Sequence, residues 1–323
     1  MNICVIGLGS MGKRRIKLLK SSRMNPVIVG IDNNRERAEG VADEFGIEVS
    51  LSLADIKLEA DCAFACTAPQ SHGAIIRECL ERNMHVFSEI NLISDMYEEN
   101  IQTARKKGKV LFLSSTPLYK AEMQIIDNNV KNSGKACAYQ YHVGQYLPDW
   151  HPWDDLKSIF ISDKRTNGCR ELLAYELPWL QHTFGLIKKV NVINRKLTAL
   201  DIDFPDTYLI QIEHANGSVG SLMVDVVSRQ AVRRLEVLNE ELYLSWNGTP
   251  DTLYEKDIMT GELKQIPAGE YIHEHGYEGF VNEYAYAKEI EEFFKVIEGK
   301  EPVYGFEEDK EILRVIDDIE KEE

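Results

Sequence analysis

Residues 1–12 of the chain read MNICVIGLGSMG. The apolar run from Ile3 to Ile6 is typical of a buried parallel strand, and it stops at a glycine. The residues after it, 13–20, predict a helix. In such a strand–turn–helix unit, one glycine makes the tight turn, a second lets the backbone approach a pyrophosphate, and a third allows close helix–strand packing. The spacing G-x-G-x-x-G places these glycines at Gly7, Gly9 and Gly12.

An acidic residue ends the next apolar run, residues 27–31. A carboxylate at the end of the second strand, about 20 residues after the glycines, accepts hydrogen bonds from the adenosine ribose hydroxyls and repels a 2′-phosphate. Asp32 therefore predicts NAD as the cofactor and disfavours NADP, although Arg35 and Arg37 leave some room for NADP. The alternative role for Asp32 is to cap the following helix, which the next two residues, both asparagines, could share.

Composition sets limits on the kind of protein. The 323 residues include 44% hydrophobic and 28% charged side chains, which is ordinary for a globular enzyme with two domains. A formal charge of −16 argues against nucleic acid or an anionic membrane surface as a partner. Residues 1–25 do not resemble a signal peptide, and no apolar stretch approaches the roughly 20 residues of a membrane span. We expect a cytoplasmic protein. The 6 cysteines are scattered and predict core thiols, with no metal site.

Strand-like and helix-like segments alternate through the first third of the chain, as a doubly wound parallel sheet requires. We therefore predict an α/β fold with a Rossmann domain over residues 1–118. Residues 119–323 contain longer strand-like runs and fewer helices, which predict an α+β domain with a large, mostly antiparallel sheet for substrate binding and oligomerisation. Two closing helices, residues 282–298 and 307–320, can pack back on the first domain. The uncovered sheet face predicts a homodimer or homotetramer.

Four landmarks resemble the glucose–fructose oxidoreductase/inositol dehydrogenase family (Gfo/Idh/MocA). They are Gly7-Leu8-Gly9-Ser10-Met11-Gly12, Asp32, Cys66-Thr67-Ala68-Pro69-Gln70-Ser71-His72 and Glu89-Ile90-Asn91. The resemblance implies a nicotinamide cofactor at these positions. The cofactor contacts that we predict are Gly7, Gly9, Ser10, Met11, Gly12, Asp32, Thr67, Pro69, His72 and Glu89. His72 has an alternative role as a capping or surface histidine.

The chain departs from the family pattern where chemistry is expected. Members usually carry Glu-Lys-Pro, and their lysine contacts the nicotinamide ribose and the reacting oxygen of the substrate. Ile90 in this chain can do neither. The family also has Asp and His four residues apart on a helix, whereas this chain offers Glu171 and Tyr175, which share one helix face. A tyrosine donates a proton only if nearby positive charge lowers its pKa from about 10. Arg170 is adjacent in sequence but not well placed.

The segment from Tyr139 to Asp155 is rich in aromatic and acidic residues, and its two prolines predict a loop leaving a strand. Its tryptophans could stack on the apolar face of a sugar, while its acids bind hydroxyl groups. The substrate contacts predicted here are Asp149, Trp150, Trp153 and Asp154. The alternative is an aromatic lid or a subunit contact. The segment, together with residues 167–172 and 176–180, resembles a family branch linked to bacterial surface-polysaccharide and nonulosonic acid biosynthesis.

These patterns predict an NAD-dependent oxidoreductase that transfers hydride to or from a sugar or nucleotide-sugar carbon. The catalytic candidates are Glu171, Tyr175 and His151, of which the histidine has the most suitable pKa for a base. Arg229, Arg233 and Arg234 either grip a substrate phosphate or carboxylate or form a solvated strand edge. Ile90 motivates the alternative of a redox-inactive regulatory or scaffolding protein that binds NAD or a nucleotide-sugar. A lyase or epimerase with tightly held NAD is a third hypothesis.

Overall fold

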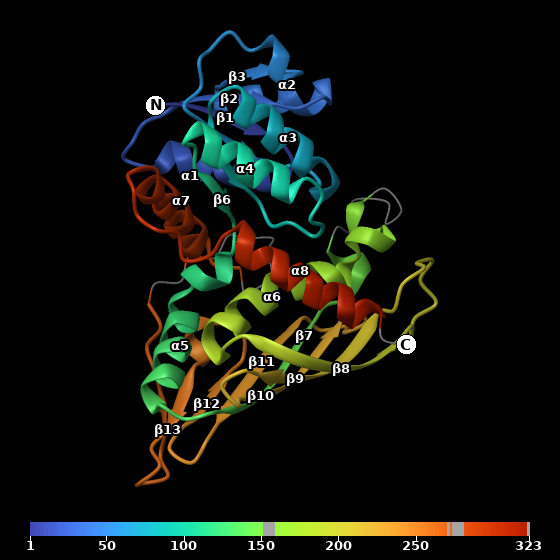
Figure 1. Cartoon of the computed structure of the whole chain (residues 1–323), viewed down its shortest axis with the longest axis vertical. Helices are drawn as coiled ribbons and strands as arrows, with labels where there is room; N and C mark the ends of the chain where they lie inside the picture. Colours follow the sequence, from blue (N-terminus) through green and yellow to red (C-terminus); the bar gives the residue numbers. More distant parts are fainter. Residues whose placement is uncertain (151–158, 270–271, 273–280, 322–323) are drawn as a thin grey trace. The chain divides into compact units, whose positions relative to one another are not determined.

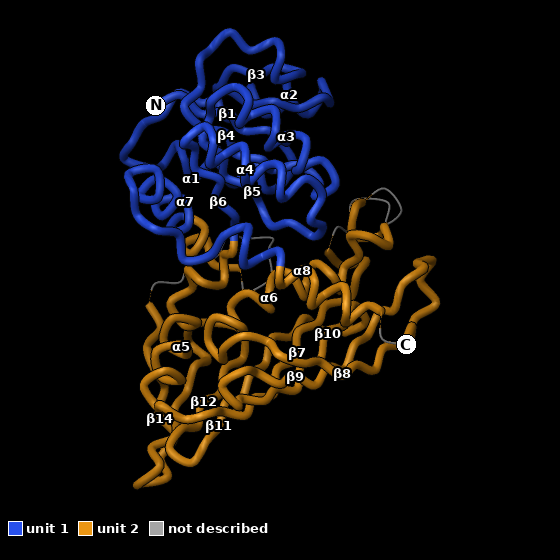
Figure 2. Tube along the Cα trace, in the orientation of Figure 1, with its two compact units in different colours: residues 1–114, 287–310 blue, residues 115–286, 311–323 orange. Residues whose placement is uncertain are grey.

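The computed structural model describes residues 1–150, 159–269, 272 and 281–321. The chain forms two compact units (Figure 2). The first contains residues 1–114 and 287–310, and the second contains residues 115–286 and 311–323. The His151, Trp153 and Asp154 predictions fall on 151–158 and lie outside the described residues.

The first unit is built on a six-stranded parallel sheet with the order β3-β2-β1-β4-β5-β6 (Figure 1). Its strands are β1 (Asn2–Ile6), β2 (Val27–Ile31), β3 (Glu48–Ser50), β4 (Cys62–Ala65), β5 (His85–Ser88) and β6 (Leu111–Leu113). The order reverses between β1 and β4, which lie side by side in parallel. In open sheets of this kind, ligands bind beyond the carboxyl ends of the strands at this reversal.

Helices connect these strands and cover both faces of the sheet. They are α1 (Ser10–Ser21), α2 (Arg35–Phe45), α3 (Pro69–Glu81) and α4 (Tyr97–Lys107), with α7 (Glu283–Ile297) added from the distant end of the chain. Phe293 of α7 packs against Phe64, Phe87 and Phe112 of three neighbouring strands. Helix α7 therefore covers the part of the sheet that α1 and α2 leave open, while right-handed crossovers put α3 and α4 on the opposite face.

The second unit is built on an eight-stranded sheet with the order β14-β13-β12-β11-β7-β10-β9-β8. Its strands are β7 (Ala138–Gly144), β8 (Ile187–Arg195), β9 (Thr207–His214), β10 (Val219–Asp225), β11 (Val232–Leu238), β12 (Tyr243–Trp246), β13 (Tyr254–Lys256) and β14 (Leu263–Gln265). All neighbouring pairs are antiparallel except β7 with β10. Helices α5 (Ala121–Ser133) and α6 (Gly168–Phe184) lie against one face of this sheet (Figure 1).

The opposite face of the second sheet carries a row of side chains in cross-strand register. Ile193, Leu209 and Met223 are paired in this row on β8, β9 and β10. The row continues through His142 to Arg234. Ile193 is 60% exposed and Leu209 is 45% exposed, so the apolar end of the row faces outward.

The predicted fold class is confirmed: a doubly wound parallel sheet precedes a mostly antiparallel one. The division between the units falls at Ser114, slightly before the predicted boundary at residue 118. The last helix, α8 (Phe306–Lys321), is divided between the two units at Lys310. Among the described residues, no helix has the length and apolar character needed to span a membrane.

Candidate functional site

The glycine-rich turn follows β1 and leads into α1. Gly7 has φ +89°, in the left-handed region, and a Cβ there would come within 2.7 Å of the Cys66 carbonyl oxygen. A Cβ on Gly12 would lie 1.9 Å from the Gly7 carbonyl oxygen, so only glycine allows α1 to pack this close to the turn. At Gly9 a Cβ would meet no atom within 4 Å. The backbone is thus open to a ligand at this position.

The beginning of α1 has the electrostatics of an anion site. Gly9 is its N-cap, and its first turn contains no acidic side chain. The first N–H groups of a helix lack partners within the helix, and the helix dipole favours negative charge there. The open backbone at Gly9 and this helix end together fit a pyrophosphate.

Asp32 follows β2 at the same edge of the sheet and is 6% exposed. Its Oδ2 accepts hydrogen bonds from the Leu8 N–H at 2.9 Å and from Arg37 Nη1 at 3.2 Å, and its Oδ1 accepts from the Asn34 N–H at 2.9 Å. Helix α2 is capped by Asn34, whose Oδ1 accepts from the Arg37 N–H. The capping alternative for Asp32 is therefore wrong. A carboxylate has about four acceptor positions, so Oδ1 keeps capacity for a ribose hydroxyl.

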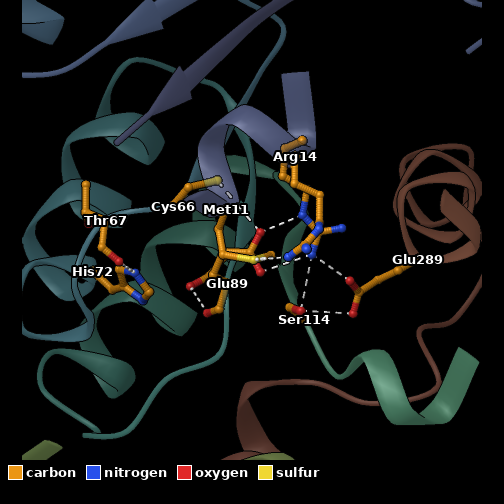
Figure 3. A network of polar contacts seen from close by, with 10 residues as sticks. Met11, Arg14, Cys66, Thr67, His72, Glu89, Ser114 and Glu289 are labelled. Carbon is orange, nitrogen blue, oxygen red and sulfur yellow. Dashed lines mark hydrogen bonds and ion pairs between the residues drawn. The ribbon is translucent and has the colours of Figure 1, made fainter. Parts of the chain in front are cut away.

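The segment after β4 contributes Thr67, Pro69 and His72. Thr67 is half-buried and accepts a hydrogen bond from Ser71 Oγ at 2.7 Å, and Pro69 begins α3. His72 is buried, and one of its ring nitrogens lies 2.7 Å from Asn91 Oδ1. The other lies 2.8 Å from the Thr67 carbonyl oxygen (Figure 3). The ring therefore joins two loops at the sheet edge and has neither nitrogen left for a cofactor. The hydrogen bonds of His72 hold this edge in shape, and its contact with the cofactor stays a prediction.

Burial lowers the pKa of His72, although the hydrogen bonds to Asn91 and Thr67 oppose this. A neutral imidazole donates from only one nitrogen. Nε2–H donates to the Thr67 carbonyl, and Nδ1 can accept only if the Asn91 amide presents its NH₂ group. Rotating that amide by half a turn satisfies both groups, since the oxygen and nitrogen of an amide are assigned from the hydrogen-bond network.

Glu89 belongs to a buried ion-pair network (Figure 3). Arg15 on α1 donates to both its carboxylate oxygens, at 2.5 Å and 3.0 Å, and pairs with Glu289 of α7 at 2.7 Å. Ser114 donates to the other oxygen of Glu289 at 3.0 Å. Burial raises the pKa of Glu289, and the Arg15 charge opposes that shift. Glu89 therefore has a structural partner, and its contact with the nicotinamide ribose stays a prediction.

The catalytic candidates that the structure describes lie on α6 in the second unit. Glu171 and Tyr175 are both half-buried. Burial raises the pKa of Glu171 to about 7, and its Oε2 has no hydrogen-bond partner among the described residues. Arg170 pairs with Asp317 and Glu320 on α8.

The positive charge near Tyr175 comes from elsewhere in the chain. Lys120 Nζ lies 5.8 Å from the centroid of its ring, and Arg233 Cζ lies 5.4 Å from it. Lys120 directly precedes α5, and Arg233 belongs to β11. Both side chains are buried. From the sequence, Arg233 was expected either to grip a substrate or to lie on a solvated strand edge, and Lys120 was not singled out. Its one signal was a cation at the start of a helix, where the dipole disfavours positive charge.

The aromatic loop begins as predicted, because β7 ends at Gly144 and a short 3₁₀ turn, Leu147–Asp149, follows it. Asp149 is exposed. The Trp150 indole N–H donates to the Gln145 carbonyl at 3.2 Å, which ties the ring to its own loop. Their roles in substrate binding stay predictions.

The three arginines considered as a substrate grip line one cavity of about 540 Å³ together with His142. Arg233 pairs with Glu176, and Arg229 lies over the Tyr146 ring at 3.9 Å. Arg234 is exposed on the outer sheet face. Arg233 thus forms a buried ion pair, whereas Arg234 lies at the surface. The three arginines differ in environment, so they form neither a common substrate grip nor a common solvated strand edge.

A larger cavity, about 850 Å³, lies in the first unit at the amino ends of the strands, lined by Met1, Asp61 and His85 among others. Dinucleotides bind at the opposite, carboxyl edge of such sheets, where the glycines and Asp32 lie. We therefore assign the cofactor to that edge and not to this cavity.

Known proteins resemble this chain in sequence and in fold. Residues 1–115 match the Gfo/Idh/MocA model, described as an oxidoreductase family with an NAD-binding Rossmann fold. NAD is thus supported as the cofactor. The chain is 25% identical over 152 residues, 46% of its length, to 4-carboxy-2-hydroxymuconate-6-semialdehyde dehydrogenase of Sphingobium sp.. The match covers 48% of that relative, so this chain spans about half of its length.

Two further proteins match along nearly the whole chain. UDP-N-acetylglucosamine 3-dehydrogenase of Acidithiobacillus ferrooxidans is 22% identical, with 94% of this chain and 91% of the relative covered. Levoglucosan dehydrogenase, solved with NADH and levoglucosan, is 19% identical, with a TM-score of 0.82 over 100% of this chain and 96% of the other. At this level of identity, the structural match shows a shared fold.

Proposed function

We propose that the chain is an NAD-dependent dehydrogenase acting on a carbinol or carbonyl group of a sugar or nucleotide-sugar. The match of residues 1–115 to the Gfo/Idh/MocA model of oxidoreductases supports this proposal. The observation that carries the proposal is the open glycine turn at Gly9 beside the carboxylate of Asp32, at the point where the strand order reverses. That combination fits the pyrophosphate and the adenosine ribose of NAD.

The residues of this chain have distinct parts in the proposed reaction. Nicotinamide supplies the hydride acceptor or donor. The turn at Gly7, Gly9, Ser10, Met11 and Gly12 binds the pyrophosphate, and Asp32 binds the ribose. Thr67, Pro69 and Glu89 line the cofactor edge, and His72 holds that edge in shape. Glu171, Tyr175 and His151 supply polar groups near the reacting carbon, and Asp149, Trp150, Trp153 and Asp154 bind the sugar.

The sugar class comes from the relatives. One acts on UDP-N-acetylglucosamine by its name, and another was solved with levoglucosan. The resemblance to a polysaccharide-linked branch supports a role in surface-polysaccharide biosynthesis. Both matches are distant, so the substrate is tested by a panel of nucleotide-sugars and simple sugars.

The test is NADH formation from NAD⁺ with each member of the panel, followed by its near-ultraviolet absorbance. We expect at least one member to give turnover, and Gly9→Val to abolish it. NADH binding without turnover on any member, in either direction, would favour the redox-inactive alternative that Ile90 motivates. Conversion of a substrate while NAD stays bound to the protein and no NADH accumulates would favour the lyase or epimerase hypothesis.

We also propose a homodimer or homotetramer formed through the outer face of the second sheet. The apolar row of exposed Ile193 and Leu209 with half-buried Met223 supports this, since burial of such a patch against a second copy removes it from water. Light scattering of the wild type and of Leu209→Lys tests it. We expect an oligomer that Leu209→Lys weakens, whereas a monomeric wild type would overturn the proposal.

A further inference from the structure

The second sheet carries a cavity that the proposed function does not use, at the polar end of its outer row. The cavity has a volume of about 540 Å³, and its lining includes His142 of β7, residues 228–234 and Asn247. All of these residues belong to the second unit. His142 is paired with Arg234 of β11, and Asn247 directly follows β12, the next strand of the sheet. The cavity therefore forms where three neighbouring strands and the loop before β11 meet.

A buried carboxylate fixes the histidine of this cavity. Asp225 is 0% exposed, and its Oδ2 lies 2.7 Å from His142 Nε2. A Cβ on Gly144 would lie 2.5 Å from the same oxygen, so only glycine leaves room for this carboxylate. Because a carboxylate only accepts hydrogen bonds, Nε2 carries the proton. The other ring nitrogen, Nδ1, has no hydrogen-bond partner among the residues that the structure describes.

The same carboxylate holds the loop that carries Arg229. Its Oδ1 accepts hydrogen bonds from the Val227 N–H at 3.0 Å and the Ser228 N–H at 2.7 Å, and its Oδ2 accepts from Ser228 Oγ at 3.0 Å. Burial raises the pKa of Asp225, but these bonds and the one from His142 outweigh it and lower the pKa overall. The loop and the histidine are thus held in place before a ligand binds, which reduces the entropic cost of binding.

The positive charge of the cavity is only partly compensated. Arg233 pairs with Glu176 of α6 at 3.0 Å. Arg229 and Arg234 are exposed, and neither forms an ion pair with a residue in the described part of the chain. The Arg229 guanidinium lies over the Tyr146 ring at 3.9 Å, a contact that uses its face and leaves its in-plane N–H donors available. No acidic residue is among the described residues that line the cavity.

These donors fit an anion with several oxygens. A guanidinium presents a planar fork of N–H groups that matches phosphate oxygens, and a protonated imidazole donates from both nitrogens. The Asp225 carboxylate stabilises that protonated form, in which His142 Nδ1 donates to the ligand. A volume of about 540 Å³ falls in the range of small-molecule sites. We propose that this cavity binds the phosphate or diphosphate group of a small molecule through Arg229, Arg234 and His142.

The inference does not rest on the proposed function, since it concerns residues of the second unit alone and its test needs no turnover. The measurement is calorimetric titration of the full-length protein with sodium pyrophosphate. We expect saturable binding that Arg229→Gln and Arg234→Gln each weaken about tenfold or more, because each change removes a charged donor. Arg195→Gln, at an exposed arginine of β8 in the same sheet, is the matched control and should bind pyrophosphate as the wild type does.

A second pair of variants locates the anion, because the beginning of α1 is also expected to bind a pyrophosphate. Gly9→Val blocks that position and should leave binding to the cavity intact, whereas the double variant Arg229→Gln/Arg234→Gln should lose it. Pyrophosphate binding that is lost in Gly9→Val and kept in the double variant would place the anion at α1 and overturn the inference. Absence of saturable binding by the wild type at millimolar pyrophosphate would overturn it as well.

Two further probes identify the source of the phosphate group. UDP that binds about tenfold or more tightly than inorganic phosphate would assign the cavity to a diphosphate ester, whereas equal affinities would assign it to free phosphate. Either result supports the inference if the double variant loses the binding, and unchanged binding in the double variant overturns it. Both substitutions are at exposed side chains, so Tm of the double variant should stay within about 3 °C of wild type, which shows that the chain has folded.

Discussion

At the scale of single residues, Gly9 allows stability and ligand binding to be separated. A Cβ at this position meets no protein atom within 4 Å, so a larger side chain does not strain the fold. It would project toward the space that we assign to the pyrophosphate. We predict that Gly9→Val changes Tm by less than about 3 °C but weakens NADH binding at least about tenfold, as measured by calorimetry.

The control for this change is Gly40→Val on α2, where a Cβ also meets nothing within 4 Å and no cofactor contact is predicted. Gly40→Val should bind NADH as the wild type does. Equal binding by Gly9→Val and wild type would show that the dinucleotide does not approach this turn.

Glu171 gives a pH-dependent prediction. Its pKa in the folded protein is raised to about 7 by burial, above the ordinary value near 4.3. The folded state therefore holds this proton more tightly, and the stability that it provides is complete below about pH 4 and is lost as the pH rises through about 7. We predict that Glu171→Gln removes part of the fall in unfolding free energy between pH 5 and pH 8, on the order of 3 kcal/mol.

Urea denaturation of both proteins across this pH range measures the effect. Glu213→Gln, at an exposed carboxylate of β9, is the control and should keep the wild-type pH dependence. Parallel curves for wild type and Glu171→Gln would contradict the assignment of a raised pKa to Glu171.

The sequence indicates the geometry of the glycine turn more directly than the surroundings of Tyr175, for a physical reason. Gly7, Gly12 and Asp32 act through local backbone geometry, which depends on residues close in the chain. The pKa of Lys120 depends on Arg233 of a distant strand and on burial. Both follow from a fold that sequence patterns do not specify. No local pattern marks a lysine whose pKa is about 8.

At the scale of elements, Arg15 joins α1 to α7 in the first unit. Arg15 and Glu289 are each 0% exposed. Removing one member of a buried ion pair leaves the other charge uncompensated, which costs about 3–5 kcal/mol. We predict that Arg15→Met lowers the unfolding free energy by that amount and that adding Glu289→Met recovers part of the loss.

Chemical denaturation measures both variants. Lys13→Met is the matched control on the same helix, because its ion pair with Glu44 is 42% and 50% exposed and should contribute less than about 1 kcal/mol. A single variant Arg15→Met as stable as wild type would show that the network contributes no net stability.

The ion pair between Arg15 and Glu289 could have been predicted from the sequence. Arg15 shares the apolar face of its helix with Ile16 and Leu19, and Glu289 lies on the face of α7 that carries Ala285 and Phe293. Opposite charges on two apolar faces indicate a buried pair. Strands β13 and β14 could not be predicted this way, since their residues are mostly exposed and lack an alternating apolar pattern.

At the scale of the whole molecule, the order of segments along the chain does not show which segments belong to which unit. Residues 287–310 follow the second sheet in sequence but belong to the first unit, where Phe293 packs on the parallel sheet. The helices were predicted, but only long-range packing assigns them to a unit. The net charge of −16 is consistent with the small-molecule ligands proposed here.

The most direct test of NAD binding at the carboxyl edge of the first sheet is calorimetric titration of the wild type and Asp32→Ala with NADH and NADPH. We predict saturable NADH binding that is tighter than NADPH binding. Asp32→Ala should weaken NADH binding about tenfold or more. It should also narrow the preference for NADH over NADPH, because Arg37 loses its ion pair with Asp32 and can bind a 2′-phosphate. Absence of NADH binding by the wild type, or equal NADH affinity in a folded Asp32→Ala variant, would contradict this account.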